Sequence, residues 1–288
     1  MILVCGASGR VGGEVVRQLQ AKGAAVRCLV RDRLRARTAL GDFVAVAQGD
    51  LDEGRGLGAA LDGVSAMFLM SPAGASLEAR QLAALRAATA AGVARVVKLS
   101  GSAWTMQPGR MTSTGAAHAE VEAAIKASGV AHAFLRPNAF MQTMLVRLRG
   151  ELAAGDHFGL ALGAARVALI DVRDIAAVAA HALTAPAAGN SALELSGPQA
   201  WSGDEIAALA STILGRTIAY RPVPCETAVA AAAARGEPPY VQQHLREVFA
   251  LMAEGAAAQV TDTVGQMTGS TARPLTAWLR EILGPVGR

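Results

Sequence analysis

The sequence predicts an α/β protein: a doubly wound parallel sheet with a smaller C-terminal α/β lobe. Two observations carry this prediction. Short apolar runs alternate with helical patterns along the first half of the chain, and a glycine-rich turn joins the first run to the first helix. Strands that alternate with helices form βαβ units, and near-continuous apolar strands agree with a sheet that is covered on both faces.

The expected elements follow in chain order. Strands are predicted at 2–5, 25–30, 43–47, 66–70, 95–99 and 132–136, with helices at 10–22, 53–62, 76–92 and 115–128. After Pro137 the alternation loosens. Further strands are predicted at 166–172 and 192–197, and further helices at 174–184, 203–214, 225–235, 239–254 and 272–283. A soft boundary is expected near residue 150, with later strands returning to the first sheet.

Composition narrows the class of protein. The 288 residues are 52% hydrophobic and 17% charged, which is ample for a sizeable core. The net charge of +4 comes mostly from scattered arginines, which argues against nucleic acid as the main partner. No apolar run reaches membrane-spanning length, and no basic leader precedes the first strand. Cys5, Cys28 and Cys225 have no paired spacing, so a cytoplasmic protein is expected.

The glycine-rich turn predicts a dinucleotide cradle. Its pattern G-x-x-G-x-x-G places Gly6 at the tight turn, Gly9 where backbone approaches a pyrophosphate, and Gly12 where helix and strand pack closely. Ser8 is expected either to cap the helix or to contact a phosphate, since a helix N-terminus attracts anions. The predicted cofactor contacts of this turn are Gly6, Ser8, Gly9, Arg10, Val11 and Gly12. An empty tight turn is the plain alternative.

The end of the second strand indicates which dinucleotide binds. Arg31 ends the strand, and a guanidinium suits a ribose 2′-phosphate by charge and geometry. Asp32 follows, and a slip of one position would make it the carboxylate of an NAD site. A solvated charged loop is a third interpretation. Asp50 and Leu51, after the third strand, are expected beside the adenine, although Asp50 could instead cap the next helix.

The stretch TSTGAAHAEVEAAI, residues 112–125, raises a question about one histidine. At helical spacing, one face carries His118, Val121, Glu122 and Ile125. Because Val121 and Ile125 must turn this face inward, His118 is expected to point inward too. A packed core histidine and a functional one both fit the pattern.

Six stretches together resemble a known family. They are GASGRVGG, LVRD, QGD, HAEVEAAIKASGVAHAFLRPNAFMQ, LIDVRDIAAVAAHAL and LELSGPQAWSGDEIAALAS. The chain resembles the NmrA-like group of atypical short-chain dehydrogenases over nearly its whole length. Its H-x-E-x-E helix is most similar to the quinone-reductase and triphenylmethane-reductase branch. The resemblance implies an NADP-binding Rossmann domain, 1–150, interleaved with a substrate lobe, 151–288. It leaves the substrate open, because the family includes reductases and silent NADP sensors.

The usual catalytic pair of short-chain dehydrogenases, Y-x-x-x-K, is missing. On the family pattern, Thr114 falls near the tyrosine position and His118 near the lysine position, and Ser100 or Ser102 matches the serine. The resemblance therefore implies that His118, Ser102 and Thr114 form the catalytic group, with His118 near the nicotinamide ribose. A threonine is too weak an acid to replace the phenol, so His118 could donate a proton, bind the ribose or only pack.

Ligands of doubly wound sheets bind beyond the carboxyl ends of the strands. Ser71, Ser100 and Pro137 lie at such ends and are expected to contact the cofactor. The predicted substrate contacts are Trp104, Met106, Asn138, Phe140, Met141 and Met144, which suit a flat, apolar ligand but could equally pack between lobes. His157, in a predicted loop, could line the same pocket. No histidine has metal-ligand spacing, so no metal is expected.

We therefore expect an NADP(H)-dependent oxidoreductase that transfers hydride to an apolar conjugated acceptor such as a quinone. A non-catalytic NADP-sensing protein and a ketone- or imine-reducing biosynthetic enzyme are the alternatives. The expected partner is a small-molecule substrate rather than nucleic acid or a membrane, and a homodimer is left open.

Overall fold

The computed structural model describes residues 1–41, 44–185 and 189–284. It divides into two compact units that interleave along the chain. Unit 1 comprises Met1–Met106, Thr114–Pro137 and Val172–Glu194, and unit 2 comprises Gln107–Ser113, Asn138–Asp171 and the chain from Leu195 onward. The expected assignment of 1–150 to the cofactor and 151–288 to the substrate concerns binding and stays a prediction.

Unit 1 is built on a seven-stranded sheet of order β3-β2-β1-β4-β5-β6-β8. The strands are β1 (Ile2–Cys5), β2 (Val26–Val30), β3 (Ala45–Gln48), β4 (Ala66–Leu69), β5 (Arg95–Leu99), β6 (Ala131–Pro137) and β8 (Ser191–Leu195). The first six pair in parallel, as predicted. Because β1 lies between β2 and β4, the strand order reverses there, and this switch point is where doubly wound sheets bind ligands.

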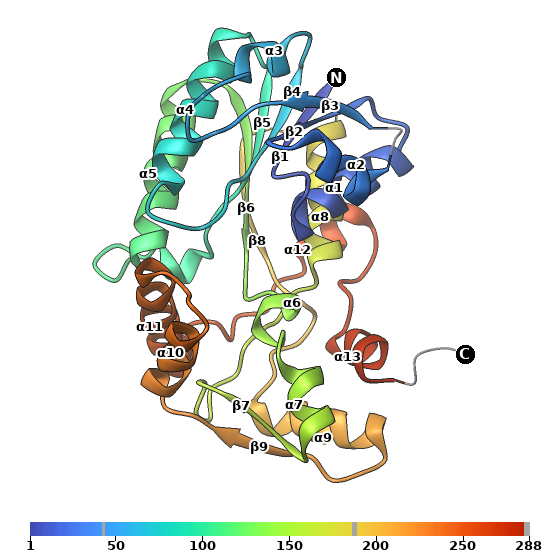
Figure 1. The fold of residues 1–288 in the computed structure, drawn as a ribbon, viewed down its shortest axis with the longest axis vertical. Helices are drawn as coiled ribbons and strands as arrows, with labels where there is room; N and C mark the ends of the chain where they lie inside the picture. Colours follow the sequence, from blue (N-terminus) through green and yellow to red (C-terminus); the bar gives the residue numbers. More distant parts are fainter. Residues whose placement is uncertain (42–43, 186–188, 285–288) are drawn as a thin grey trace. The chain divides into compact units, whose positions relative to one another are not determined.

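Helices cover both faces of this sheet (Figure 1). They are α1 (Arg10–Ala21), α2 (Arg33–Leu40), α3 (Leu57–Leu61), α4 (Leu77–Ala90), α5 (Ser113–Ala127) and α8 (Val172–Thr184), and a short 3-10 helix, η1 (Ala103–Thr105), lies in the loop after β5. On one face, a core from α3, α4 and α5 packs against β5 and β6; it includes Ala84, Val96, Val121, Ile125 and Phe134. On the other face, α1 and α8 pack against each other. The doubly wound prediction is confirmed.

Unit 2 contains a small parallel pair, β7 (His157–Leu160) and β9 (Ala219–Pro222). Its helices are α6 (Met141–Met144), α7 (Leu148–Ala154), α9 (Gly203–Leu214), α10 (Cys225–Ala234), α11 (Pro239–Ala253), α12 (Thr263–Thr268) and α13 (Leu275–Leu283). α9 begins with a capping box in which the Ser202 hydroxyl accepts from the Glu205 N–H while the Glu205 carboxylate accepts from the Ser202 N–H. α10 packs on α11, and α9 packs on α13.

Some predicted elements were wrong. The run 166–172 is not a strand: it makes only isolated bridges, Ile170 with Phe140 and Val167 with Trp201, and Val172 already begins α8. His157 was placed in a loop but starts β7. The short elements α2, α6, α7, β7, β9 and α12 were not predicted, and residues 42–43 of the predicted third strand lie outside the described residues. Within the described part of the chain, no helix is both long and apolar enough to span a bilayer.

Candidate active site

The turn between β1 and α1 has the close packing that the glycine pattern predicted. Gly6 adopts a φ of +68°, which side-chain-bearing residues rarely adopt. A Cβ on Gly12 would lie 2.1 Å from the Gly6 carbonyl oxygen, so only glycine lets α1 approach the turn. At Gly9 the nearest atom to an added Cβ, again the Gly6 oxygen, is 3.2 Å away, so this position is far less crowded by the protein itself. The N-cap of α1 is Gly9 and makes no side-chain cap bond, so the expectation that Ser8 caps this helix was wrong.

A cavity of about 250 Å³ opens beside this turn, at the carboxyl ends of β1, β2 and β3. Its lining includes three cradle residues, Gly6, Ser8 and Gly9, followed by Arg31, Asp50, Leu51, Asp52, Met70, Pro72 and Arg80. Arg80 forms an ion pair with Asp52 at 2.5 Å. The cavity therefore combines a helix N-terminus with an exposed guanidinium, Arg31, which suits an anionic ligand.

The two acidic residues near this cavity have local roles. Asp32 accepts a hydrogen bond from the Leu34 N–H at 2.8 Å, at the start of α2, and it is not among the lining residues. Asp50 lines the cavity and accepts from the Asp52 N–H at 2.8 Å within its loop. The next helix, α3, begins at Leu57 with Gly56 as its N-cap, so Asp50 does not cap it.

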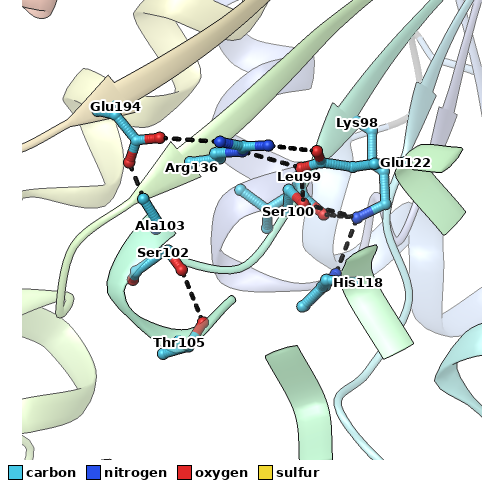
Figure 2. A network of polar contacts seen from close by, with 10 residues as sticks. All are labelled: Lys98, Leu99, Ser100, Ser102, Ala103, Thr105, His118, Glu122, Arg136 and Glu194. Carbon is cyan, nitrogen blue, oxygen red and sulfur yellow. Dashed lines mark hydrogen bonds and ion pairs between the residues drawn. The ribbon is translucent and has the colours of Figure 1, made fainter. Parts of the chain in front are cut away.

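His118 points inward from α5, and a buried lysine lies opposite it (Figure 2). Lys98, the penultimate residue of β5, has no exposed surface, and its Nζ lies 2.8 Å from His118 Nδ1. The same Nζ donates to the Ser100 hydroxyl at 3.0 Å and approaches the Leu99 carbonyl oxygen at 3.4 Å. The His118 face was predicted correctly: Val121, Glu122 and Ile125 are buried.

The network continues from Ser100 through two carboxylates. The Ser100 hydroxyl donates to Glu122 Oε1 at 2.6 Å, and Arg136 of β6 donates to both oxygens of Glu122, from Nε at 3.0 Å and from Nη2 at 2.5 Å. Arg136 Nη1 also reaches Glu194 of β8 at 3.2 Å. Glu194 in turn accepts from the Ala103 N–H at 3.3 Å (Figure 2). Four charged side chains thus alternate in sign along one line.

Burial and pairing act against each other on these groups. Burial raises the pKa of the Glu122 carboxyl, but its hydrogen bonds from Arg136 and Ser100 outweigh burial and hold that pKa below its usual value. At Glu194, burial raises the pKa and outweighs the opposing contacts with Arg136 and the Ala103 N–H. For Lys98, burial lowers the pKa from 10.5 to about 7; Glu122 opposes this shift and Arg136 adds to it. The ammonium of Lys98 therefore holds its proton weakly near neutral pH.

Backbone around β5 fixes the position of the imidazole ring. A Cβ on Gly101 would lie 3.0 Å from His118 Cδ2, so the ring packs on a glycine that leaves it room. The Ser102 hydroxyl donates to the Pro137 carbonyl oxygen at 2.5 Å, and the Thr105 hydroxyl donates to the Ser102 carbonyl oxygen at 2.7 Å. These bonds hold the loop after β5 against the end of β6.

The other predicted site residues are distributed over both units. Thr114 is half-buried in the first turn of α5 and Ser71 accepts from the Gln81 amide at 3.1 Å. Arg10 is exposed and Val11 is buried at the start of α1. Trp104 and Met106 lie in and directly after η1, and Met106 is buried. In unit 2, Asn138 donates to the Ala257 carbonyl oxygen at 2.9 Å, Phe140 bridges to Ile170, and Met141 is buried. Their roles stay predictions.

A second, larger cavity of about 610 Å³ lies entirely within unit 2. Its apolar lining includes Met144, Phe158, Leu160, Val223, Leu245 and Phe249. Its polar lining comprises Arg147, Glu151, His157, Arg221 and Arg235, together with threonines. Arg147 pairs with Glu151 at 2.8 Å, and Arg221 lies 3.5 Å from His157 Nε2. Within the described part of the chain, Arg235 forms no ion pair. This volume suits a small organic ligand.

The described residues contain no group of three or more side chains that could hold a metal ion.

Comparison with known proteins identifies the family of this chain. The model of the NmrA-like family matches residues 1–278. The chain belongs to the NmrA-like family. An NAD(P)H azoreductase from Xenophilus azovorans is 38% identical over 273 residues, covering 95% of this chain and 94% of that protein.

Two further proteins extend the comparison. A (4-alkanoyl-5-oxo-2,5-dihydrofuran-3-yl)methyl phosphate reductase from Streptomyces griseus is 38% identical over 281 residues, covering 98% of this chain and 97% of that protein. The crystal structure of an NADPH-dependent quinone oxidoreductase from Escherichia coli, complexed with NADPH, superposes with a TM-score of 0.88 at 23% identity. It covers 99% of this chain and all of that one, which shows a shared fold. The family resemblance seen in the sequence is confirmed.

Sequence reasoning missed the partners of His118 in this NmrA-like chain. Lys98 was treated as part of a strand, and Glu122 only as a member of a helix face. One signal was available: a lysine within the apolar run RVVKL must lie in a buried strand, where an unpaired charge is costly. Pairing that lysine with the inward face of the next helix would have pointed to Glu122 and His118.

Proposed function

We propose that this protein is an NADPH-dependent reductase of apolar conjugated acceptors. The azoreductase, the dihydrofuran phosphate reductase and the quinone oxidoreductase are all reductases, and the named acceptors of all three contain conjugated or unsaturated groups. The observation that carries the proposal for this chain is the cavity at the sheet switch point, where the glycine turn meets Arg31.

The residues of that cavity fit a dinucleotide phosphate. A Cβ is excluded at Gly12, and Gly9, without a side chain, lines the cavity at the N-terminus of α1, where backbone N–H groups can bind a pyrophosphate. Arg31 lines the cavity and would bind the 2′-phosphate, whereas Asp32 is engaged at the start of α2. Asp50, Leu51 and Pro72 would flank the adenosine. NADPH bound there supplies a hydride.

For the acceptor, we propose the larger cavity of unit 2. Apolar walls from Phe158, Leu160 and Phe249 suit a flat aromatic body, and a volume of about 610 Å³ accommodates one. Of the predicted substrate residues, Met144 lines this cavity, as does His157. The other predicted substrate residues do not line this cavity, and their contact with the acceptor stays a prediction; they are Trp104, Met106, Asn138, Phe140 and Met141.

The missing tyrosine restricts the acceptor. Hydride transfer to a plain ketone leaves an alkoxide, which needs a strong nearby acid. A quinone or an azo compound instead gives a stabilised anion, so proton transfer need not accompany hydride transfer. We propose that His118, supported by the Ser100 and Ser102 loop, assists this step and that Thr114 only helps to shape the site.

The experiment is a comparison of kcat with NADPH for one quinone, one azo dye and one aliphatic ketone, in the wild type and in His118→Ala. Conjugated acceptors are expected to be reduced and the ketone not, with a moderate loss of rate and retained NADPH binding in the variant. Fast ketone reduction that is lost in His118→Ala would favour the second candidate, a carbonyl-reducing biosynthetic enzyme. The similarity to the dihydrofuran phosphate reductase is the observation that supports this candidate. NADPH binding without turnover of any acceptor would indicate a sensor.

A further inference from the structure

The contacts of Lys98 fix the direction of the hydrogen bonds around it. The Ser100 hydroxyl has one proton, which it donates to Glu122 Oε1 at 2.6 Å. The 3.0 Å contact between Lys98 Nζ and this hydroxyl must therefore be donated by the lysine. Below its pKa of about 7, Lys98 is an ammonium and has only donors, so at the 2.8 Å contact His118 Nδ1 accepts. The ring proton of neutral His118 then lies on Nε2.

The charges of the network also keep His118 neutral. Lys98 and Arg136 balance Glu122 and Glu194, so the line of four charged groups has no net charge when His118 is uncharged. An imidazolium would put a second positive charge 2.8 Å from a lysine without exposed surface. In a medium of low dielectric constant this repulsion is large.

We propose that Lys98 is a positioning residue that holds His118 as the neutral tautomer with its proton on Nε2, and that Lys98 returns a proton to Nδ1 when Nε2 gives one up.

This inference rests on the proposed function only for its catalytic consequence. After hydride has reached the acceptor, the resulting anion takes the proton from His118 Nε2, forming an O–H or N–H bond. Lys98 Nζ simultaneously gives a proton to Nδ1. The ammonium becomes a neutral amine, the imidazole changes tautomer without becoming an imidazolate, and the acceptor anion becomes neutral, so one positive and one negative charge disappear together. The cycle closes when a proton from solvent adds to His118 Nε2 and the Nδ1 proton returns to Lys98 Nζ, which restores the starting tautomer and the ammonium.

The surroundings of Lys98 suit this exchange. The charged or titratable groups that the described contacts bring to it are His118 and Glu122 from α5 and Arg136 from β6. From α4, which packs into the core on this face, come Ala84, Leu85 and Ala88, which carry no charge. Burial lowers the pKa of Lys98 to about 7, so the amine gives and regains its proton near neutral pH.

The direct test reads the tautomer of His118 in the resting protein. The protein is labelled with ¹⁵N in histidine, and His118→Ala assigns the ring among the five histidines. At pH 6.5 the wild type should show a pyridine-like Nδ1 and a protonated Nε2. A proton on Nδ1, or an imidazolium at this pH, overturns the proposal without any measurement of turnover.

The variant Lys98→Met removes the ammonium and keeps an unbranched side chain of similar length; Lys126→Met, at the end of α5, is the matched control. In Lys98→Met, His118 should become a mixture of tautomers and form imidazolium at higher pH than in the wild type. Lys126→Met should match the wild type. An unchanged Nε2–H tautomer in folded Lys98→Met would show that another group sets it and overturn the proposal.

The kinetic arm uses a quinone at saturating NADPH. The wild-type kcat should fall as pH rises through about 7, because the ammonium is lost. In Lys98→Met, kcat at pH 6.5 should be about tenfold lower and flat across this range, with NADPH affinity unchanged. Identical pH profiles in both proteins would refute the relay. No quinone turnover by the wild type would instead refute the proposed function and leave the tautomer assignment to the NMR result.

Discussion

At the scale of single residues, the prediction that the protein prefers NADPH to NADH depends on Arg31. Its guanidinium lines the switch-point cavity, and the neighbouring carboxylate of Asp32 is bound to the Leu34 N–H. Arg31→Ala should weaken NADPH binding by about 1.5–3 kcal/mol, the range for a charge-assisted bond, and NADH binding little. Titration of nucleotide fluorescence measures both affinities. Arg33→Ala, an equally exposed arginine two residues on, is the control and should change neither. Equal losses for the two nucleotides would show that Arg31 does not read the phosphate.

Substitutions at two glycines of the same turn should have different effects, one on dinucleotide binding and the other on stability. A Cβ added to Gly9 would meet the Gly6 carbonyl oxygen at 3.2 Å, a tight contact that a small shift relieves, but the side chain would occupy the pyrophosphate position. Gly9→Val should therefore fold and lose dinucleotide binding. Gly12→Ala places a methyl 2.1 Å from the Gly6 oxygen and should lower the free energy of unfolding before any ligand is added. Thermal melts and NADPH titrations separate these effects, and full NADPH affinity in folded Gly9→Val would remove the basis of the cradle.

At the scale of elements, β5 and α5 show what the hydrophobic pattern of the sequence can and cannot predict. The apolar run RVVKL predicted β5, and the spacing of Val121 and Ile125 predicted both α5 and its inward face. What periodicity could not supply was the register that brings Lys98 opposite His118, because that depends on how a helix lies across a strand 20 residues earlier in the chain. The same holds for Arg136, whose partner Glu194 comes from a strand far along the chain.

The short elements failed for a different reason. β7 and β9 pair with each other, and their sequences, HFGL and AYRP, lack the continuous apolar run that marks the equally short β1 and β4. The run 166–172 has such a pattern, yet its apolar residues pack as extended chain with only single bridges. The apolar sequence of this run correctly indicates that it is buried. Whether it pairs as a strand depends on the surrounding chain, which the run itself does not encode.

Lys98 of β5 is buried against α5, and its lowered pKa predicts that the free energy of unfolding depends on pH. Its pKa is about 7 in the folded protein and 10.5 as the ordinary value. Between these values the unfolded chain binds the proton and the folded chain does not, so stability rises with pH over this window. From pH 7 to pH 9.5 the free energy of unfolding of the wild type should gain about 3 kcal/mol relative to Lys98→Met.

Urea unfolding at the two pH values measures this difference. Comparison with the variant removes contributions that both proteins share, such as those of the buried thiols Cys5 and Cys28, whose pKa values burial raises to about 12. A relative change near zero would mean that Lys98 keeps an ordinary pKa in the folded protein.

For the whole molecule, the composition of the cavity proposed for the acceptor predicts a preference among acceptors of the same redox chemistry. Three arginines and one glutamate line this largely apolar space in unit 2, together with His157 and two threonines, and the glutamate already pairs with Arg147. Arg235 has no ion pair among the described residues, and a guanidinium beside apolar walls favours a ligand with an aromatic body and a carboxylate or sulfonate. An azo dye with such a group should therefore have a lower KM than its uncharged analogue.

Arg235→Gln should raise the KM of the anionic dye about five- to tenfold, which corresponds to the roughly 1 kcal/mol of a partly exposed charged contact, and leave the KM of the neutral dye unchanged. Arg149→Gln is the matched control, because Arg149 is an exposed arginine of α7 that does not line the cavity. Higher KM values for both dyes in Arg235→Gln would indicate a change of cavity shape rather than of charge, and unchanged values for both would mean that acceptors bind elsewhere.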